Sequence, residues 1–343
     1  MSIRSSAAVV TRTIPIKPWS VQAAPGAAGG LQRQRLWWQI GFFVLFVVAP
    51  VFDILRFDLQ AGHAIVLGFD WRLGLDDFFA GRIGATEAGV NILLRLFLPI
   101  FAGALLLIAV AWRWGRLYCG WLCPHFSVVE TINHLMRHAS GRPSLWEKKP
   151  LPDRNPDGSA FAVNWRWWLV TVPLAVAFAF VWAVVLITYL LPPMEVYANL
   201  LTLQPTRNQF IFITAGTVVL SIEFLFARHL FCRYGCAVGL FQSLAWMSNR
   251  GAMVIGFERS RAAECGACYR RDNVGAAACE VVCPMRLKPR STKNAMFTCT
   301  QCAQCIAACT TVQGEGATLL TWIDREAARQ SEAQVSLTGR RDN

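Results

Sequence analysis

Cys299-Thr-Gln-Cys302-Ala-Gln-Cys305-Ile-Ala-Ala-Cys309 is the stretch that decides the fold of this 343-residue chain. Three cysteines at two-residue spacing can surround three irons of one [4Fe–4S] cluster, while the fourth points to a different cluster. A second motif precedes it, Cys265-x2-Cys268-x10-Cys279-x3-Cys283-Pro284, in which the second and third cysteines are separated by an insertion. Eight cysteines in two such motifs predict two clusters.

Crossed ligation, in which the last cysteine of each motif binds the other motif's cluster, assigns the eight cysteines to two sites. One expected site has Cys265, Cys268, Cys279 and Cys309, and the other has Cys299, Cys302, Cys305 and Cys283. Four-cysteine zinc sites also use CxxC pairs, but they use two pairs rather than a triplet with a distant fourth cysteine. We therefore expect two [4Fe–4S] clusters in a ferredoxin-like α+β domain over residues 251–323.

The rest of the chain has the composition of a membrane protein. Charged residues make up 16% of the sequence, against about 25% in soluble domains. Four apolar runs are long enough to cross a bilayer, at residues 36–55, 92–112, 168–191 and 209–227. We expect a mainly α protein with a disordered leader (1–35), a domain of four transmembrane helices (36–250), the ferredoxin domain and a polar tail (324–343).

Basic residues are distributed unevenly between the loops. The leader and the loop between the second and third runs are rich in Arg and Lys, whereas the first loop holds more acids than bases. The positive-inside rule then places both termini and the ferredoxin domain in the cytoplasm. We expect a multi-pass protein of the cytoplasmic (inner) membrane, whose net charge of +12 serves topology and not nucleic-acid binding.

An internal repeat brings the remaining four cysteines into two matched groups. Cys119 and Cys123 follow the second apolar run, Cys232 and Cys236 follow the fourth, and the offset is 113 residues for both. Such repeats indicate two pseudo-symmetric halves with duplicated sites near their interface, and a helical CxxxC would place both thiols on one face. We expect the four thiols to form a copper site or a further cluster; redox disulfides and plain packing are the alternatives.

Other ionisable residues are weaker candidates. His125, directly after the first CxxxC-Pro, could be a ligand or proton relay. Glu223 lies inside the fourth run, where an ionised group costs about 3 kcal/mol and tends to be functional. It could serve a proton or quinol role, or it could snorkel to the interface four residues away. Glu130, His134 and His138 share a helical face and could bind a metal or haem, although a solvated amphipathic helix is the simpler interpretation. The sequence has no CxxCH, and neither c-type haem nor flavin is expected.

Three segments in this order carry a family resemblance: Gly115-Arg-Leu-Tyr-Cys-Gly-Trp-Leu-Cys-Pro124, then Phe231-Cys-Arg-Tyr-Gly-Cys236 with Phe241-Gln-Ser243, then the ferredoxin block. They resemble the CcoG (FixG/RdxA) family of membrane polyferredoxins and, more distantly, NapH and NosR, over about residues 35–324. The resemblance implies cupric reduction in the assembly of a cbb-type oxidase, or quinol-linked electron delivery.

We therefore expect electron transfer between two cytoplasmic clusters and a site at the membrane edge. Its partner would be a cupric ion, a quinone or a respiratory redox protein, and whether the chain is itself an enzyme stays open. The alternatives are a copper-handling assembly factor and the anchor subunit of a redox complex.

Overall fold

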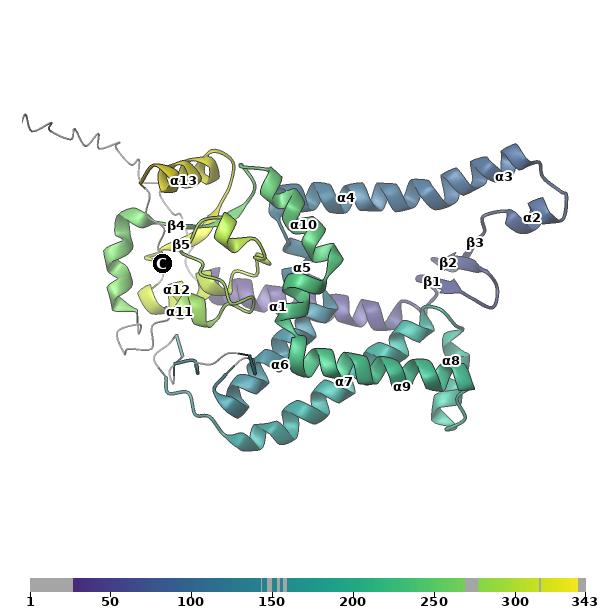
Figure 1. The fold of residues 1–343 in the computed structure, drawn as a ribbon, viewed down its shortest axis with the longest axis horizontal. Helices are drawn as coiled ribbons and strands as arrows, with labels where there is room; N and C mark the ends of the chain where they lie inside the picture. Colours follow the sequence, from purple (N-terminus) through teal and green to yellow (C-terminus); the bar gives the residue numbers. More distant parts are fainter. Residues whose placement is uncertain are drawn as a thin grey trace, which may run out of the picture.

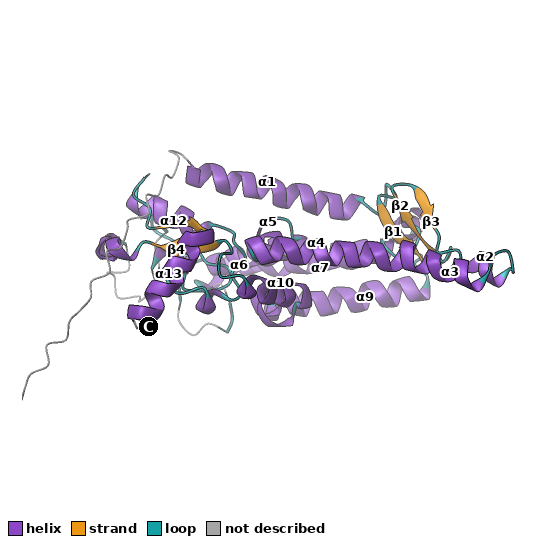
Figure 2. Ribbon diagram, turned by 90° about the horizontal axis from the view of Figure 1, so that it is seen from above, coloured by secondary structure: helices purple, strands orange, loops and turns teal. Residues whose placement is uncertain are grey.

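A computed structural model describes residues 27–142, 144–146, 150–152, 155–156, 159–268, 277–314 and 316–338. Long helices run side by side; the cysteine-rich C-terminal region lies at one end and a small sheet at the other (Figures 1 and 2). The helices are α1 (Ala27–Val48), α2 (Leu75–Phe79), α3 (Ala85–Ile92), α4 (Leu98–Trp114), α5 (Leu117–Trp121), α6 (Pro124–Ser140), α7 (Trp168–Thr188), α8 (Pro193–Leu201), α9 (Arg207–Ile222), α10 (Ala237–Ser248), α11 (Ala278–Val281), α12 (Gln304–Gln313) and α13 (Arg325–Thr338). The strands are β1 (Leu55–Asp58), β2 (His63–Val66), β3 (Phe69–Trp71), β4 (Val254–Phe257) and β5 (Leu320–Ile323).

Three helical stretches of the described chain are long and apolar enough to span a membrane. They are Ala85–Trp114, Trp165–Thr188 and Arg207–Ala227, and they contain most of the second, third and fourth expected runs. The third run was expected to continue to residue 191, but its helix ends at Thr188. The chain is therefore a mostly helical protein with at least three candidate spans.

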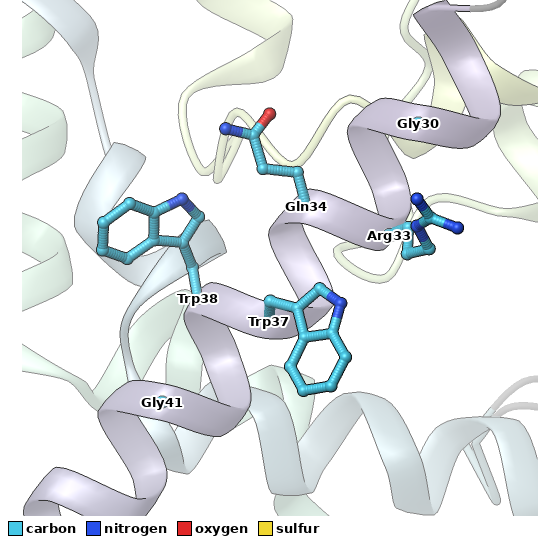
Figure 3. Close-up of a pocket in the computed structure, with 6 residues that line it drawn as sticks. All are labelled: Gly30, Arg33, Gln34, Trp37, Trp38 and Gly41. Atoms are coloured by element: carbon cyan, nitrogen blue, oxygen red, sulfur yellow. The ribbon is translucent and has the colours of Figure 1, made fainter.

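The first expected span corresponds only in part to a helix. α1 begins at Ala27, inside the segment expected as a disordered leader, and ends at Val48, after which the chain turns into β1. Residues 1–26 of that leader lie outside the described residues. Figure 3 shows Trp37 and Trp38 projecting from α1. The two residues are 67% and 55% exposed. Exposed tryptophans of this kind are typical of a membrane–water interface.

Small side chains let α7 and α9 approach each other closely. Ala175, Ala179 and Ala183 of α7 are fully buried, and a Cβ added to Gly216 of α9 would lie 3.1 Å from the Cβ of Ala183. Between transmembrane helices, where lipid is as apolar as leucine, such close packing is what holds helices together. α7 and α9 therefore form a closely packed helix pair in the membrane part.

The first and third loops meet at the end remote from the cysteines. β1, β2 and β3 form an antiparallel sheet in this order, and the backbone N–H of Phe57 in β1 donates to the carbonyl of Tyr189 just after α7. Figure 2 shows this sheet at the opposite end of the long helices from β4 and α12. The two ends of the helices therefore carry different structures.

The C-terminal region is an α+β unit joined to the membrane part by a common core. β4 pairs antiparallel with β5, Val254 opposite Ile323, and the stretch between the two strands holds all eight ferredoxin-type cysteines. Ile255 and Leu320 belong to the same buried cluster as Phe126 of α6 and Trp246 of α10. In the segment expected as a polar tail, the chain continues as helix α13 to Thr338.

Gly120 of α5 marks the tightest contact between these two parts. A Cβ at this position would lie 2.1 Å from the backbone oxygen of Thr300, in the loop that carries the second cysteine motif. The neighbouring Trp121 donates from its indole N–H to the carbonyl of Gln301 at 3.1 Å. The membrane-edge helix and the cysteine loop are thus in direct backbone contact.

Substituting Gly120→Ala should therefore destabilise the protein by about 1–3 kcal/mol, the usual cost of overpacking a close contact. The measurement is thermal unfolding of the detergent-purified protein with and without the substitution. Gly103→Ala in α4 is the control, because a Cβ there meets no atom within 4 Å. Equal melting temperatures for Gly120→Ala and Gly103→Ala would show that the contact is absent.

Candidate iron–sulfur centres and membrane-edge cysteines

Two cavities in the C-terminal region are each lined by four cysteines. The first is lined by Cys283, Cys299, Cys302 and Cys305, with Ile255, Met285 and Met296 as apolar wall. The second is lined by Cys265, Cys268, Cys279 and Cys309, with Phe257, Leu320 and Arg290 beside them. The structure groups the eight cysteines as crossed ligation does, so that each motif contributes its last cysteine to the other cavity.

Helix α12 explains how one motif reaches both cavities. Gln301 and Ala303 have positive φ angles of 54° and 58°, a conformation uncommon outside glycine, and they curl the loop around the first cavity. Cys305 lies in the first turn of α12, and Cys309 follows one turn later. Most of the insertion in the other motif, residues 269–276, lies outside the described residues.

Backbone N–H groups point at several of these sulfurs. Cys268 accepts from Ala278 N at 3.3 Å, Cys283 from Leu287 N at 3.3 Å, and Cys309 from Leu319 N at 3.4 Å. Hydrogen bonds to cluster sulfurs are one of the means by which proteins set a cluster's reduction potential. The donors therefore suit sulfurs that carry negative charge.

Burial raises the pKa of most of these thiols. The pKa of Cys283 rises to about 11 because its side chain is removed from water. Burial also raises the pKa of Cys302, although the positive charge of Arg35 lowers this pKa in part. A buried thiol stays neutral at pH 7 unless a metal takes the place of its proton. Four such thiols around one cavity form a donor set that fits an iron–sulfur cluster.

The two membrane-edge CxxxC groups have matching local structure. Cys119 lies in the short helix α5 that follows α4, and Cys232 lies in a π-helical turn, Phe231–Gly235, that follows the fourth span. Cys123 and Cys236 are the N-caps of α6 and α10, both with extended backbone. The expectation of a continuous helix through each CxxxC is therefore wrong, because the second cysteine leaves the helix and starts a new one.

The four membrane-edge thiols lie within electrostatic range of one another across the two groups. In addition to burial, a negative charge on Cys236 raises the pKa of both Cys119 and Cys123, and charges on Cys119 and Cys123 raise the pKa of Cys232. Burial raises the pKa of Cys119 to about 12 and raises that of Cys232 as well. The repeat therefore brings its duplicated cysteines to one region at the membrane edge.

Arg116 is a buried cation in the middle of this region. Its side chain is 1% exposed; Nε donates to Ser243 Oγ at 2.5 Å and Nη1 to the carbonyl of Cys232 at 2.9 Å. Its Nη2 is buried without a hydrogen-bond partner among the described residues. The negative charges nearest to it would be thiolates of Cys119, Cys236, Cys232 and Cys299. The sequence gives no sign that Arg116 is buried, because its burial depends on tertiary packing.

His125 and Glu223, two further candidates, lie together beside the membrane-edge cysteines. His125 Nε2 is 3.4 Å from Glu223 Oε1, and both side chains are largely buried. Glu223 begins a π-helical turn, Glu223–Ala227, at the end of the fourth span, and π-helical turns are frequent at functional sites. The structure thus joins two candidates that are 98 positions apart in the sequence.

The third candidate group has partners of a different kind. The carboxylate of Glu130 accepts hydrogen bonds from Arg35, Gln39 and Gln304, whereas the rings of His134 and His138 pack together with centroids 4.7 Å apart. In the described part of the chain, no group of three or more His, Cys, Asp or Glu side chains converges on a single ion. A cluster does not require such convergence, because each cysteine binds its own iron.

Comparisons with known proteins point to iron–sulfur chemistry at these segments. A family model described as "4Fe-4S binding domain" matches residues 96–143 and 208–251, which contain the two CxxxC groups. The regulatory protein NosR of Stutzerimonas stutzeri is 26% identical over 220 residues, 62% of this chain and 25% of that protein. NosR of Pseudomonas aeruginosa is 29% identical over 179 residues, 52% of this chain and 20% of that protein. No solved structure matches the chain.

The chain spans a quarter or less of the length of these curated relatives. The matched domain, the similarity to NosR and the three apolar helices support an iron–sulfur protein with transmembrane helices. These findings support the expected resemblance to NosR. The resemblance to the CcoG family stays an expectation.

Proposed function

We propose that this chain is a membrane-bound electron-transfer protein that holds two [4Fe–4S] clusters on the cytoplasmic side of the inner membrane. The observation that carries the proposal is the pair of cavities, each lined by four cysteines taken crosswise from two motifs. Bound clusters would supply one-electron redox chemistry. The eight cysteines would hold the clusters in a hydrophobic core that is shared with α6 and α10. The clusters would therefore lie next to the membrane edge.

We further propose that Cys119, Cys123, Cys232 and Cys236 hold a third redox group, and we favour another cluster over a copper ion. A 4Fe–4S family model covers both CxxxC segments, and no three of the described thiols converge on one ion. The buried guanidinium of Arg116 provides positive charge for a group that is anionic in total. The electron path would then run between the two cavities and this site, because Gly120, next to Cys119, closely approaches Thr300 in the lining of the cavity that holds Cys299 and Cys302.

Topology is part of the same proposal. The cysteine-rich end and the β1–β3 end lie at opposite ends of the long helices (Figure 2), and loop charge favours the cysteine-rich end as cytoplasmic. With α1 as a fourth span, both termini would lie in the cytoplasm. A copper-handling assembly factor is the second candidate, since four soft thiols also suit Cu(I); a third is the anchor subunit of a redox complex.

Metal content after anaerobic purification tests the proposal. Two clusters predict about eight iron atoms and as many acid-labile sulfides per chain, and a third cluster raises both to about twelve. One copper per chain together with eight irons would favour the copper-handling alternative. Stoichiometric zinc with negligible iron would contradict every version of the proposal.

A further inference from the structure

Two helices of the membrane part, α1 and α6, place a buried ion pair beside the first four-cysteine cavity, the one that Cys302 lines. The pair consists of Arg35 on α1 and Glu130 on α6, whose side chains are 4% and 20% exposed. Two nitrogens of Arg35 donate to the two carboxylate oxygens of Glu130. The third, Nε, donates to the carbonyl of Gly120 at 2.8 Å. These partners hold the guanidinium in a defined position between α5 and α6.

Two glutamine side chains join this ion pair to the loop that carries the second cysteine motif. Arg35 Nη1 donates to the amide oxygen of Gln32 at 3.2 Å, and the amide nitrogen of Gln32 donates to the carbonyl of Cys302 at 3.0 Å. Gln304, the first residue of α12, donates to the carboxylate of Glu130. Both charges of the pair are therefore linked to the wall of the first cavity.

The two charges act on this cavity with unequal strength. Burial raises the pKa of Cys302; the positive charge of Arg35 lowers this pKa in part, and the negative charge of Glu130 raises it by a smaller amount. A [4Fe–4S] cluster gains one negative charge when it is reduced, so a cation that acts more strongly than its counterion favours the reduced form. Because the pair is buried, salt screens it little. Arg35 should therefore raise the reduction potential of a cluster in this cavity.

The second cavity has a similar ion pair, which belongs to the C-terminal region itself. Arg290 lines this cavity and donates to Glu280 at 2.9 Å, and the two side chains are 20% and 15% exposed. Burial raises the pKa of Cys279, and the positive charge of Arg290 lowers it in part. Each cavity thus has an arginine–glutamate pair beside it, but the pair of the first cavity comes from α1 and α6.

We propose that Arg35 and Glu130 set the reduction potential of the cluster in the first cavity, Arg35 by raising it and Glu130 by lowering it. The inference rests on the proposed function, because it assigns the two residues to one of the proposed clusters. The potential of this cluster then depends on the packing of α1 and α6 against the cysteine loop. The potential of the second cluster depends instead on Arg290 and Glu280.

Redox titration of the anaerobically purified full-length protein, followed by EPR, tests this proposal. The first cluster is the one that Cys302→Ser removes. At a fixed ambient potential, Arg35→Gln should lower its ratio of reduced to oxidised form about tenfold, a shift of about 59 mV for a one-electron couple. Glu130→Gln should shift the same cluster in the opposite direction. Arg290→Gln is the matched control, because it removes the corresponding charge beside the second cavity and should shift the second cluster alone.

Arg35→Lys keeps the positive charge and should leave the potential close to that of the unsubstituted protein. Glu130→Gln keeps the test valid if Arg35→Gln fails to fold, because glutamine has nearly the size of glutamate. Shifts of the same sign in Arg35→Gln and Glu130→Gln, equal shifts of both clusters, or no shift would overturn the proposal. Iron content is measured on the same samples. Protein without iron would contradict the proposed function, whereas about eight irons per chain with unshifted potentials would contradict the tuning role alone.

Discussion

Replacing Cys309 by serine should remove the same cluster as replacing Cys265, although the two cysteines belong to different sequence motifs. Cys309 lines the cavity of Cys265, Cys268 and Cys279. Cys283 lines the cavity of Cys299, Cys302 and Cys305. Losing one of four ligands should cost a cluster, or about four irons per chain. Cys309→Ser and Cys265→Ser should therefore leave identical low-temperature EPR spectra from the surviving cluster, and Cys283→Ser should match Cys302→Ser.

Thr310→Ser is the control next to Cys309, because it keeps a hydroxyl and removes only one methyl group. It should keep full iron content and the spectrum of the unsubstituted protein. If each motif instead held its own cluster, Cys309→Ser would match Cys302→Ser and Cys283→Ser would match Cys265→Ser. That pairing of spectra would show crossed ligation to be wrong, even with the total iron content as expected.

Features that depend on local spacing could be predicted from the sequence. The grouping of the eight cysteines follows from motif spacing together with the crossed ligation of two-cluster ferredoxins, and in the structure the same two groups line the two cavities. Three of the four apolar runs become long helices, because length and hydropathy along one segment are sufficient to indicate a span. The repeat of 113 residues likewise appears as two similar helix–turn–helix segments around the CxxxC groups.

Features that depend on long-range packing could not be predicted. Arg35 lies in the segment expected as a disordered leader, but α1 extends into that segment, and Arg35 donates a hydrogen bond to Glu130 on α6. The equal spacing of the cysteines likewise gives no sign of the helix that ends inside each CxxxC. Pro124 was a signal for the first break, since the residue before a proline tends to be extended; Ala237 gives no such signal for the second.

Replacing Arg116 by methionine should destabilise the protein by about 3–5 kcal/mol if the membrane-edge thiols bind a metal or cluster as thiolates. Removing one partner of a buried charge pair leaves the other charge uncompensated, and this is the usual cost. Arg116 is 1% exposed, and four cysteines lie within its electrostatic range. Chemical or thermal unfolding measures the effect, and loss of iron in excess of eight per chain should accompany it. Arg116→Lys should recover part of the stability because it keeps the charge.

Whether Arg116→Met lowers or raises the stability shows whether the membrane-edge cysteines are thiolates or neutral thiols. Burial raises the pKa of Cys119 and Cys232, so without a metal these thiols are neutral at pH 7 and Arg116 is itself the uncompensated charge. Methionine would then relieve the cost of burying that charge, and Arg116→Met would be neutral or stabilising. Arg113→Met is the control, because Arg113 pairs with Asp324 near the surface at 2.5 Å, where ion pairs contribute about 1 kcal/mol or less. A stabilising Arg116→Met beside a nearly silent Arg113→Met would show that the membrane-edge cysteines pack as thiols, and the electron path would have to end at the two four-cysteine cavities.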